Sequence, residues 1–328
     1  MSTDSPTSEL PVVAVPPPAV AARRRRAWLP LIGIAVSVVA LAAVVWWAAH
    51  QQAPQLPSTP KEIAALIGAI ALYALASCVR AERWERLLAD EGAKPRRADM
   101  YALTAVGYMG NNVLPARAGD AIRVVLAAPR AETSRRTVVG TLVAERILDV
   151  AVLLVLFVIV GYGLLGEVGG HSVELIALAV GWRFIRRNEK LHGMLGPIAS
   201  ATLSLRKANH GLRLLALTLL IWAIETGVWM STGAAVGFHM NPIEGCYLVA
   251  LASVFSMIPS GPGYAGTQDA AVTIGIKALG GTGGTAVGYL LMLRFVIVVP
   301  ITLVGMILLV VRYGGLKNLR AARAEARS

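Results

Sequence analysis

The sequence has 328 residues, of which 56% are hydrophobic and 15% are charged, and this balance excludes an ordinary soluble domain. Several apolar stretches are about 18 residues or longer, which is enough for a helix to cross a bilayer. Lysine and arginine outnumber aspartate and glutamate by 31 to 19, giving a formal net charge of +12. In a membrane protein such an excess marks cytoplasmic loops, so we expect no nucleic-acid partner.

The residues that could form a disulfide or hold a metal are few and scattered. The two cysteines, Cys78 and Cys246, both lie in apolar surroundings, which argues against a disulfide framework or a zinc site. The five histidines lie near the ends of apolar segments, and none has metal-ligand spacing to another. We therefore expect no metal and no cofactor.

The N-terminal region predicts a tail followed by a first membrane helix. Residues 1–27 are rich in proline, serine and threonine, carry a run of arginines at their end, and predict a disordered basic cytoplasmic tail. The apolar run at 28–49 is longer than that of a signal peptide, so we expect an uncleaved spanning helix. The connection at 50–60 lacks arginine and is assigned to the outside.

The second apolar run, residues 61–79, is expected to bring the chain back to the cytoplasm. The following segment, 80–97, is strongly basic, and we interpret it as a cytoplasmic loop. Its lysines and arginines are Arg80, Arg83, Arg86, Lys94, Arg96 and Arg97.

The next segment, residues 98–129, combines a broken helix with charge. Two short apolar arms surround the sequence GYMGNNVLPARAGDAIR, in which Pro115, the asparagines and the glycines disfavour a helix. Because both ends have basic flanks, we expect a re-entrant hairpin that opens to the cytoplasm. Arg117, Asp120 and Arg123 would then lie at membrane depth, which is tolerated only beside an enclosed or watery cavity. The hairpin therefore predicts one wall of a polar site.

The third span, residues 137–165, carries Glu145, Arg146 and Asp149. Glu145 and Asp149 are four residues apart and share a helix face, whereas Arg146 and Asp149 are three apart and can pair. An ionisable residue costs about 2.5–3.5 kcal/mol at the centre of a spanning helix, so three of them need a partner or a purpose. We expect them to line the polar site; a salt-bridged cluster at the cytoplasmic end of the helix is the alternative.

Two further spans are expected before the second broken segment. Residues 172–185 are short for a span, but the basic sequence RFIRRNEK follows them, and residues 191–205 fit an interfacial helix. The fifth span, 212–236, has Glu225 near its middle. We expect this carboxylate to face the bundle interior, toward Arg294 in the last span.

A second broken segment runs from about 243 to 279. Its break has the sequence PSGPGYAGTQD, with Pro259, Gly261, Gly263 and Gly266, and Asp269 follows directly. Its flanks lack the basic residues of the first hairpin, so we expect it to open to the outside. The last span, about 284–311, leads into a basic cytoplasmic tail at 313–328.

Together these features predict an all-α, polytopic integral membrane protein with about six spanning helices, two inverted re-entrant hairpins and both termini in the cytoplasm. The transmembrane domain is expected at residues 28–312. Paired broken segments of opposite orientation indicate a transport site near the bilayer midplane. Helix starts and arginines there suit an anionic group such as phosphate. The alternative is that the arginines only pair with the nearby acids.

Three motifs, NNVLPARAGDAIR, ERILD and IPSGPGYAGTQD, resemble the lysylphosphatidylglycerol-synthase transmembrane-region family, also called flippase-like proteins. The resemblance covers most of residues 28–312 and implies a bacterial inner-membrane protein. In the best understood members, the membrane region moves a lipid between leaflets after a soluble aminoacyl-transferase domain has modified it. The family pattern usually has Glu at Asp120 and often has Gly-Gly at Gly263-Tyr264, so this chain departs from it there. Carried over residue by residue, the motifs fall on Asn112, Pro115, Arg117, Gly119, Asp120 and Arg123, on Glu145, Arg146 and Asp149, and on Pro259, Gly261, Gly263 and Gly266.

We expect a translocase of an anionic or modified phospholipid or a lipid-linked precursor, working beside a separate lipid-modifying transferase. We expect no catalytic residues, because the sequence has no nucleotide-binding glycine loop and no serine–histidine pairing. A membrane enzyme with Asp120 or Glu145 as base, or an accessory subunit, are the alternatives. To the motif residues above, the expected substrate site adds Glu225, Asp269 and Arg294.

Overall fold

The computed structural model describes residues 53–114, 118–165, 208–256 and 266–315, with a few more between 42 and 51. Over these residues the chain forms eight helices and no strand, which confirms the all-α class. The helices are α2 (Pro60–Asp90), α3 (Arg97–Val113), α4 (Ala118–Arg130), α5 (Arg135–Leu165), α8 (Ala208–Ala234), α9 (Pro242–Ser256), α10 (Thr267–Ala278) and α11 (Gly283–Tyr313).

Three of the described helices are long and apolar enough to cross a membrane: α2, most of α8 (His210–Ala234) and α11. They correspond to the expected second, fifth and last spans. The crossing expected of α5 stays a prediction, as do those of residues 28–49 and 172–185. Residues 172–185 and the interfacial helix expected at 191–205 lie outside the described residues, and so does most of 28–49.

Helix α2 begins where the sequence supplies a complete N-terminal cap. The Thr59 side chain accepts a hydrogen bond from the backbone N–H of Glu62, and the Glu62 carboxylate accepts one from the backbone N–H of Thr59. Pro60 occupies the first turn, where its missing N–H costs nothing. These contacts fix the end of α2 that follows the connection at 50–60.

The other end of α2 corrects the expected cytoplasmic loop. The helix continues past Val79 to Asp90, and Arg83 is one of its buried residues. The physical reason is that Ala81, Trp84 and Leu88 recur at helical spacing and pack into the protein core. Arg80, Arg83 and Arg86 therefore belong to a helix that enters the bundle, whereas Lys94 and Arg96 lie exposed in the short connection to α3.

Helices α3 and α4 form a hairpin whose break is narrower than expected. Helix continues to Val113 and resumes at Ala118, so most of the stretch expected to be non-helical is helical. The glycines serve packing here: a Cβ on Gly110 would lie 2.7 Å from the Cα of Gly119, and a Cβ on Gly119 would overlap the carbonyl oxygen of Gly107. Glycine at these positions lets the two arms lie in direct backbone contact.

The two ends of this hairpin meet, as a hairpin that enters and leaves on one side requires. The backbone N–H of Lys94, before α3, donates to the carbonyl of Ala131, after α4, at 2.9 Å. The Lys94 ammonium also lies 3.0 Å from the Glu132 carboxylate. Re-entry of the hairpin into a membrane stays a prediction.

Helices α9 and α10 form the second pair. They pack together where Gly275 faces Leu248, and a Cβ on Gly275 would also lie 3.3 Å from a methyl carbon of Leu251. Helix α10 begins after Gly266, whose φ of +97° is a conformation that side chains rarely adopt. The expected break, including Pro259, Gly261 and Gly263, lies outside the described residues.

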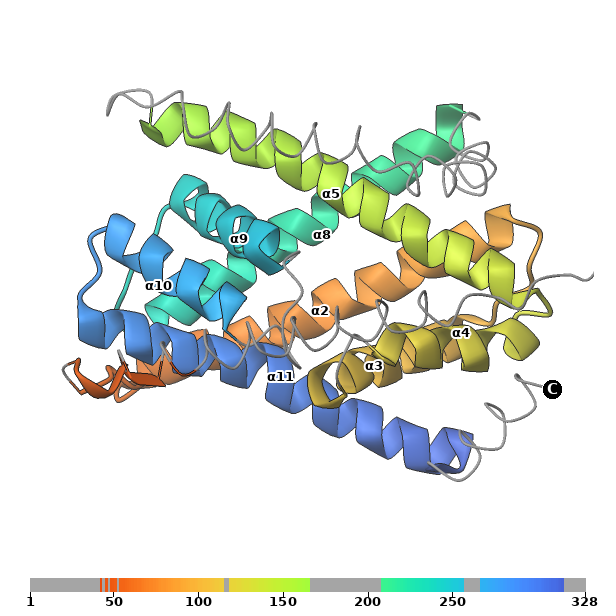
Figure 1. Ribbon diagram of the computed structural model, residues 1–328, viewed down its shortest axis with the longest axis horizontal. Coiled ribbons are helices and arrows are strands. Elements are labelled where there is room, and N and C mark those ends of the chain that lie inside the picture. Colours follow the sequence, from red (N-terminus) through yellow and green to blue (C-terminus); the bar gives the residue numbers. More distant parts are fainter. Residues whose placement is uncertain are drawn as a thin grey trace, which may run out of the picture.

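The two hairpins lie toward opposite ends of α2 and α11 (Figure 1). Helices α9 and α10 share an apolar cluster with the N-terminal parts of α2 and α11, centred on Tyr289 and Trp229. Helices α3 and α4 share another with the C-terminal parts of the same two helices, centred on Trp84 and Met100. The polar site described next adjoins the second cluster.

Candidate functional site

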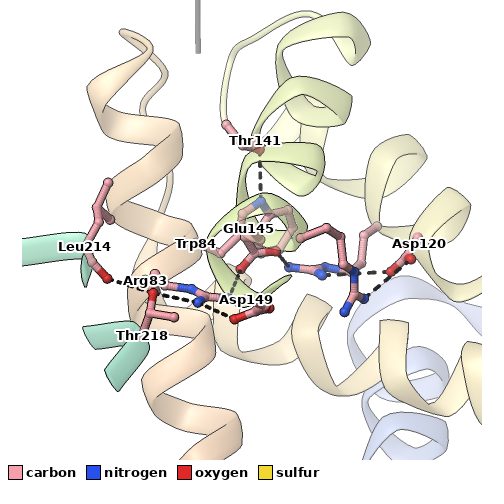
Figure 2. Close-up of polar contacts among 10 residues, drawn as sticks. Arg83, Trp84, Asp120, Thr141, Glu145, Asp149, Leu214 and Thr218 are labelled. Carbon is pink, nitrogen blue, oxygen red and sulfur yellow. Dashed lines mark hydrogen bonds and ion pairs between the residues drawn. The ribbon is translucent and has the colours of Figure 1, made fainter. Parts of the chain in front are cut away.

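A buried ion-pair network joins α2, α4, α5 and α8, and its most deeply buried arginine is Arg83 of α2. The Arg83 guanidinium binds Asp149 of α5 through two N–H groups, at 2.7 and 3.1 Å. It also donates to the Thr218 hydroxyl of α8 at 2.9 Å and lies 3.8 Å from Glu145 (Figure 2). The Arg83 side chain is only 1% exposed, so this bidentate pair is shielded from solvent.

Arg123 carries the network from α5 into the hairpin. Its guanidinium lies 3.2 Å from the Glu145 carboxylate and 3.9 Å from the centre of the Trp84 ring, a cation–π distance. Trp84 in turn donates from its indole N–H to Thr141 at 3.2 Å (Figure 2). Gly107 makes room for this arginine, since a Cβ there would lie 2.7 Å from Arg123 Cγ.

The network loosens at the start of α4. Asp120 lies 3.7 Å from Arg146 and 3.9 Å from Arg123, distances longer than a hydrogen bond. The Asp120 side chain is 29% exposed and that of Arg146 is 45% exposed, in contrast to the enclosed pair at Arg83. Asp149 binds Arg83 of α2, and Arg146 lies beside Asp120 at the start of α4, so the two residues of α5 contact different helices.

Glu225 does not face Arg294 as expected. It accepts a hydrogen bond from Arg80 of α2, and Arg80 also lies 5.9 Å from the centre of the Trp222 ring. Arg294 instead binds Asp269 of α10 through its Nε at 2.7 Å. The reason is helix adjacency: α8 packs mainly on α2, whereas α10 lies against α11.

Asp269 has two structural partners. One carboxylate oxygen binds Arg294, and the other accepts the backbone N–H of Gly266 at 2.9 Å. It therefore caps the start of α10 and ties this helix to α11. This pair is separate from the network at Arg83.

Within the described part of the chain, the network pairs four arginines with four carboxylates, so its formal charge is zero. Of the arginines expected in the substrate site, Arg123 and Arg146 lie beside acids of this network, and Arg294 lies beside Asp269. That they also receive a substrate stays a prediction. The arginines are Arg80, Arg83, Arg123 and Arg146, and the acids are Asp120, Glu145, Asp149 and Glu225.

The other expected site residues are not brought into this network. Asn112 donates to Thr302 of α11 at 3.0 Å, and Gly119 packs against α3. Pro115 and Arg117 lie outside the described residues, as the break of the second hairpin does. Among the residues with a description, no group of three or more His, Cys, Asp or Glu could hold a metal ion.

Sequence reasoning missed Arg80, Arg83 and Thr218 as members of the site. Arg80 and Arg83 are three residues apart and thus share a helix face, and Ala81, Trp84 and Leu88 supply the apolar spacing of a continuing helix. That spacing could have indicated an inward-facing helix.

Comparison with protein families matches residues 31–305 to the family described as the lysylphosphatidylglycerol synthase TM region. The matched range includes every residue of the ion-pair network and both hairpins. No curated protein and no solved structure matched the chain. Because the family match covers well over half of the sequence, this multi-pass membrane protein belongs to the lysylphosphatidylglycerol synthase TM-region family.

Proposed function

We propose that the protein is a translocase that moves an anionic or modified phospholipid, or a lipid-linked precursor, between the leaflets of the bacterial inner membrane. The family relates the chain to lipid modification or translocation. The observation that carries the finer proposal is the partly exposed edge of the ion-pair network, where Asp120 lies beside Arg123 and Arg146. On this proposal the chain performs no chemical step, and a separate transferase supplies any modified lipid.

A phosphate can exchange with Asp120 at this edge. The arginines already lie near a carboxylate at 3.7 and 3.9 Å, so an anionic headgroup would replace one acid by another without leaving a bare cation. The Nε of Arg123 is buried and has no hydrogen-bond partner among the described residues, so it is a donor ready for an oxygen atom. Arginine suits this role because its planar donors match phosphate oxygens.

The start of α4 adds backbone donors to the same edge. The first N–H groups of a helix have no partner within that helix, and the helix dipole favours an anion there. Asp120 lies in the first turn of α4, where an acid is stabilised by that dipole. The proposed headgroup would occupy the same field.

The tightly paired inner part has a different role in this proposal. Arg83 and Asp149 hold α2 and α5 at fixed distance, so exchange at Asp120 does not disturb the bundle. The proposed topology has about six spans, two inverted hairpins that open to opposite faces, and cytoplasmic termini. In such inverted architectures the transport site lies between broken helices.

Transport of fluorescent phosphatidylglycerol tests the proposal. The protein is reconstituted in proteoliposomes labelled in both leaflets, and dithionite, which does not cross the bilayer, bleaches the outer leaflet. Exchange should make nearly all fluorescence bleachable, whereas protein-free vesicles should keep about half. Wild-type vesicles that behave like protein-free vesicles, with the protein folded and monodisperse, would favour an accessory subunit over a translocase.

Asp120→Asn sharpens the test. This variant keeps the shape of the side chain but removes the competing charge, so we expect tighter binding of the anionic lipid and slower release. Arg136→Gln is the matched control, since Arg136 is exposed at the start of α5 and is not part of the network. A parental transport rate in Asp120→Asn would remove the hairpin edge from the transport path.

A further inference from the structure

An apolar groove of about 330 Å³ lies between α2, α3 and α11. This volume lies in the range typical of small-molecule and cofactor sites. Aliphatic and aromatic side chains form nearly all of its lining, and Arg312 stands among them as the one charged side chain. Its other lining residues include Tyr73, Ser77, Cys78, Tyr101, Ala105 and Val304.

The end of the groove at Arg312 carries an excess of positive charge. Asp99 of α3 lies 3.1 Å from Arg312 and 4.0 Å from Arg130, so one acid serves two arginines. Glu82 does the same for Arg86 at 2.7 Å and Arg97 at 3.5 Å. Four arginines thus share two carboxylates, leaving a formal charge of +2, whereas the buried network is balanced.

Two of these arginines remain accessible. The Arg312 side chain is 41% exposed and that of Arg97 is 70% exposed, although both contact an acid. Tyr101, which lines the groove, is also partly exposed and adds a hydroxyl group to the same end. An apolar slot with a cationic, partly exposed end matches a molecule with an apolar chain and an anionic head.

Helix packing holds the two sides of this end in place. Gly305 lets α11 approach α3, because a Cβ there would lie 2.5 Å from the Ala105 carbonyl oxygen and from Met109 Cβ. This contact fixes the helix that carries Arg312 against the helix that carries Asp99 and Tyr101. The groove is therefore a formed feature of the bundle.

We propose that this groove binds one acyl chain of an anionic glycerophospholipid, with the phosphate at Arg312 and Arg97. The site lies on α2, α3 and α11, whereas the ion-pair network lies on α2, α4, α5 and α8. The inference rests on the proposed function in naming a phospholipid as the ligand, and it assigns that lipid a holding site beside the hairpin. The α3–α4 hairpin takes part in both sites, because α3 lines the groove and α4 carries Asp120 and Arg123 of the network.

Cys78 reports directly on the occupant, because it lines the groove and is exposed. In a Cys246→Ser variant it is the single remaining thiol of the chain. The full-length variant in dodecylmaltoside micelles is reacted with N-ethylmaleimide, and the labelling rate is followed by mass spectrometry. Dioleoylphosphatidylglycerol and dioleoylphosphatidylcholine are added at equal mole fractions.

We expect phosphatidylglycerol to slow labelling at about tenfold lower mole fraction than phosphatidylcholine, the factor that one charge-assisted hydrogen bond provides. Arg312→Gln should remove this difference, and Arg136→Gln, which changes an exposed arginine elsewhere, should keep it. Native mass spectrometry should count one tightly bound phosphatidylglycerol fewer in Ala74→Phe, which fills the groove. Ala71→Phe, on an exposed part of α2 outside the lining, should bind the parental number.

Three results would overturn the proposal. They are equal protection by the two lipids, protection that survives Arg312→Gln, and a Cys78 that never reacts in lipid-poor micelles. The last result would mean that another segment of the chain covers the groove. If phosphatidylglycerol protects Cys78 but no transport is detected with dithionite, the translocase proposal fails and the groove proposal stands. If transport is detected but phosphatidylglycerol does not protect Cys78, the groove proposal fails and the translocase proposal stands.

Discussion

Replacing Arg83 by methionine should strongly destabilise the protein. Methionine keeps the length of the aliphatic stem but removes the guanidinium that binds Asp149, Thr218 and Glu145. Glu145 retains Arg123, whereas Asp149, whose side chain is 12% exposed, loses its close partner. Breaking one side of a buried pair costs about 3–5 kcal/mol, because the remaining charge is left without compensation.

A double-variant cycle isolates the pair from other effects. Equilibrium unfolding is measured in mixed micelles of dodecylmaltoside and sodium dodecyl sulfate, for Arg83→Met, Asp149→Leu and the two together. The double variant should lose less stability than the sum of the single losses, because it buries no unpaired charge. Arg86→Gln is the control on the same helix: its pair with Glu82 is partly exposed and should be worth less than about 1 kcal/mol.

The reasoning is refuted if Arg83→Met unfolds at the same denaturant fraction as Arg86→Gln. Additive losses in the cycle would also contradict it, since they would mean that Arg83 and Asp149 stabilise the fold independently.

Three further perturbations test the rest of the structure. Gly119→Ala should destabilise by about 1–3 kcal/mol through overpacking of the hairpin, whereas Gly140→Ala, with open space around it, should stabilise α5 by about 0.5–1 kcal/mol; equal effects in the same unfolding assay would disprove close hairpin packing. Arg80→Gln should lower the yield of folded protein in size-exclusion chromatography, because it leaves the Glu225 carboxylate of α8 without its arginine partner. Adding Glu225→Gln, which removes that charge, should restore the yield. In a background without the native cysteines, Ala53→Cys should react with an impermeant maleimide added to intact cells and Glu91→Cys should not, and labelling of the latter would reverse the proposed orientation.

The sequence predicted three of the long apolar helices of this fold, because long apolar runs have few other stable structures in a bilayer. Helices α2, α8 and α11 lie where those runs lie. The same argument placed Arg83 in a loop, since it counted positive charge and ignored the apolar spacing of Trp84 and Leu88. A charge count locates the membrane boundary only when the arginines face solvent.

The pairing of charges was less predictable than their presence. Glu225 and Arg294 were assigned to each other because both lie within apolar spans, yet they bind Arg80 and Asp269. Which helices touch depends on interdigitating side chains across the bundle, and a single sequence contains no direct record of that. The packing role of Gly110 and Gly119 could not be predicted for the same reason: a side chain is excluded at these positions only because the other arm of the hairpin lies against them.

Headgroup-resolved transport tests the central claim most directly. Dithionite-detected exchange is measured for fluorescent phosphatidylglycerol and fluorescent phosphatidylcholine, in vesicles that contain either the parent or Arg146→Gln. Arg146 is the most exposed cation of the network edge, with 45% of its side chain accessible. We expect Arg146→Gln to slow exchange of phosphatidylglycerol by about tenfold, the loss of one charge-assisted contact, and to leave phosphatidylcholine exchange unchanged. Equal rates for the parent and the folded variant with phosphatidylglycerol would show that the network edge does not receive the headgroup.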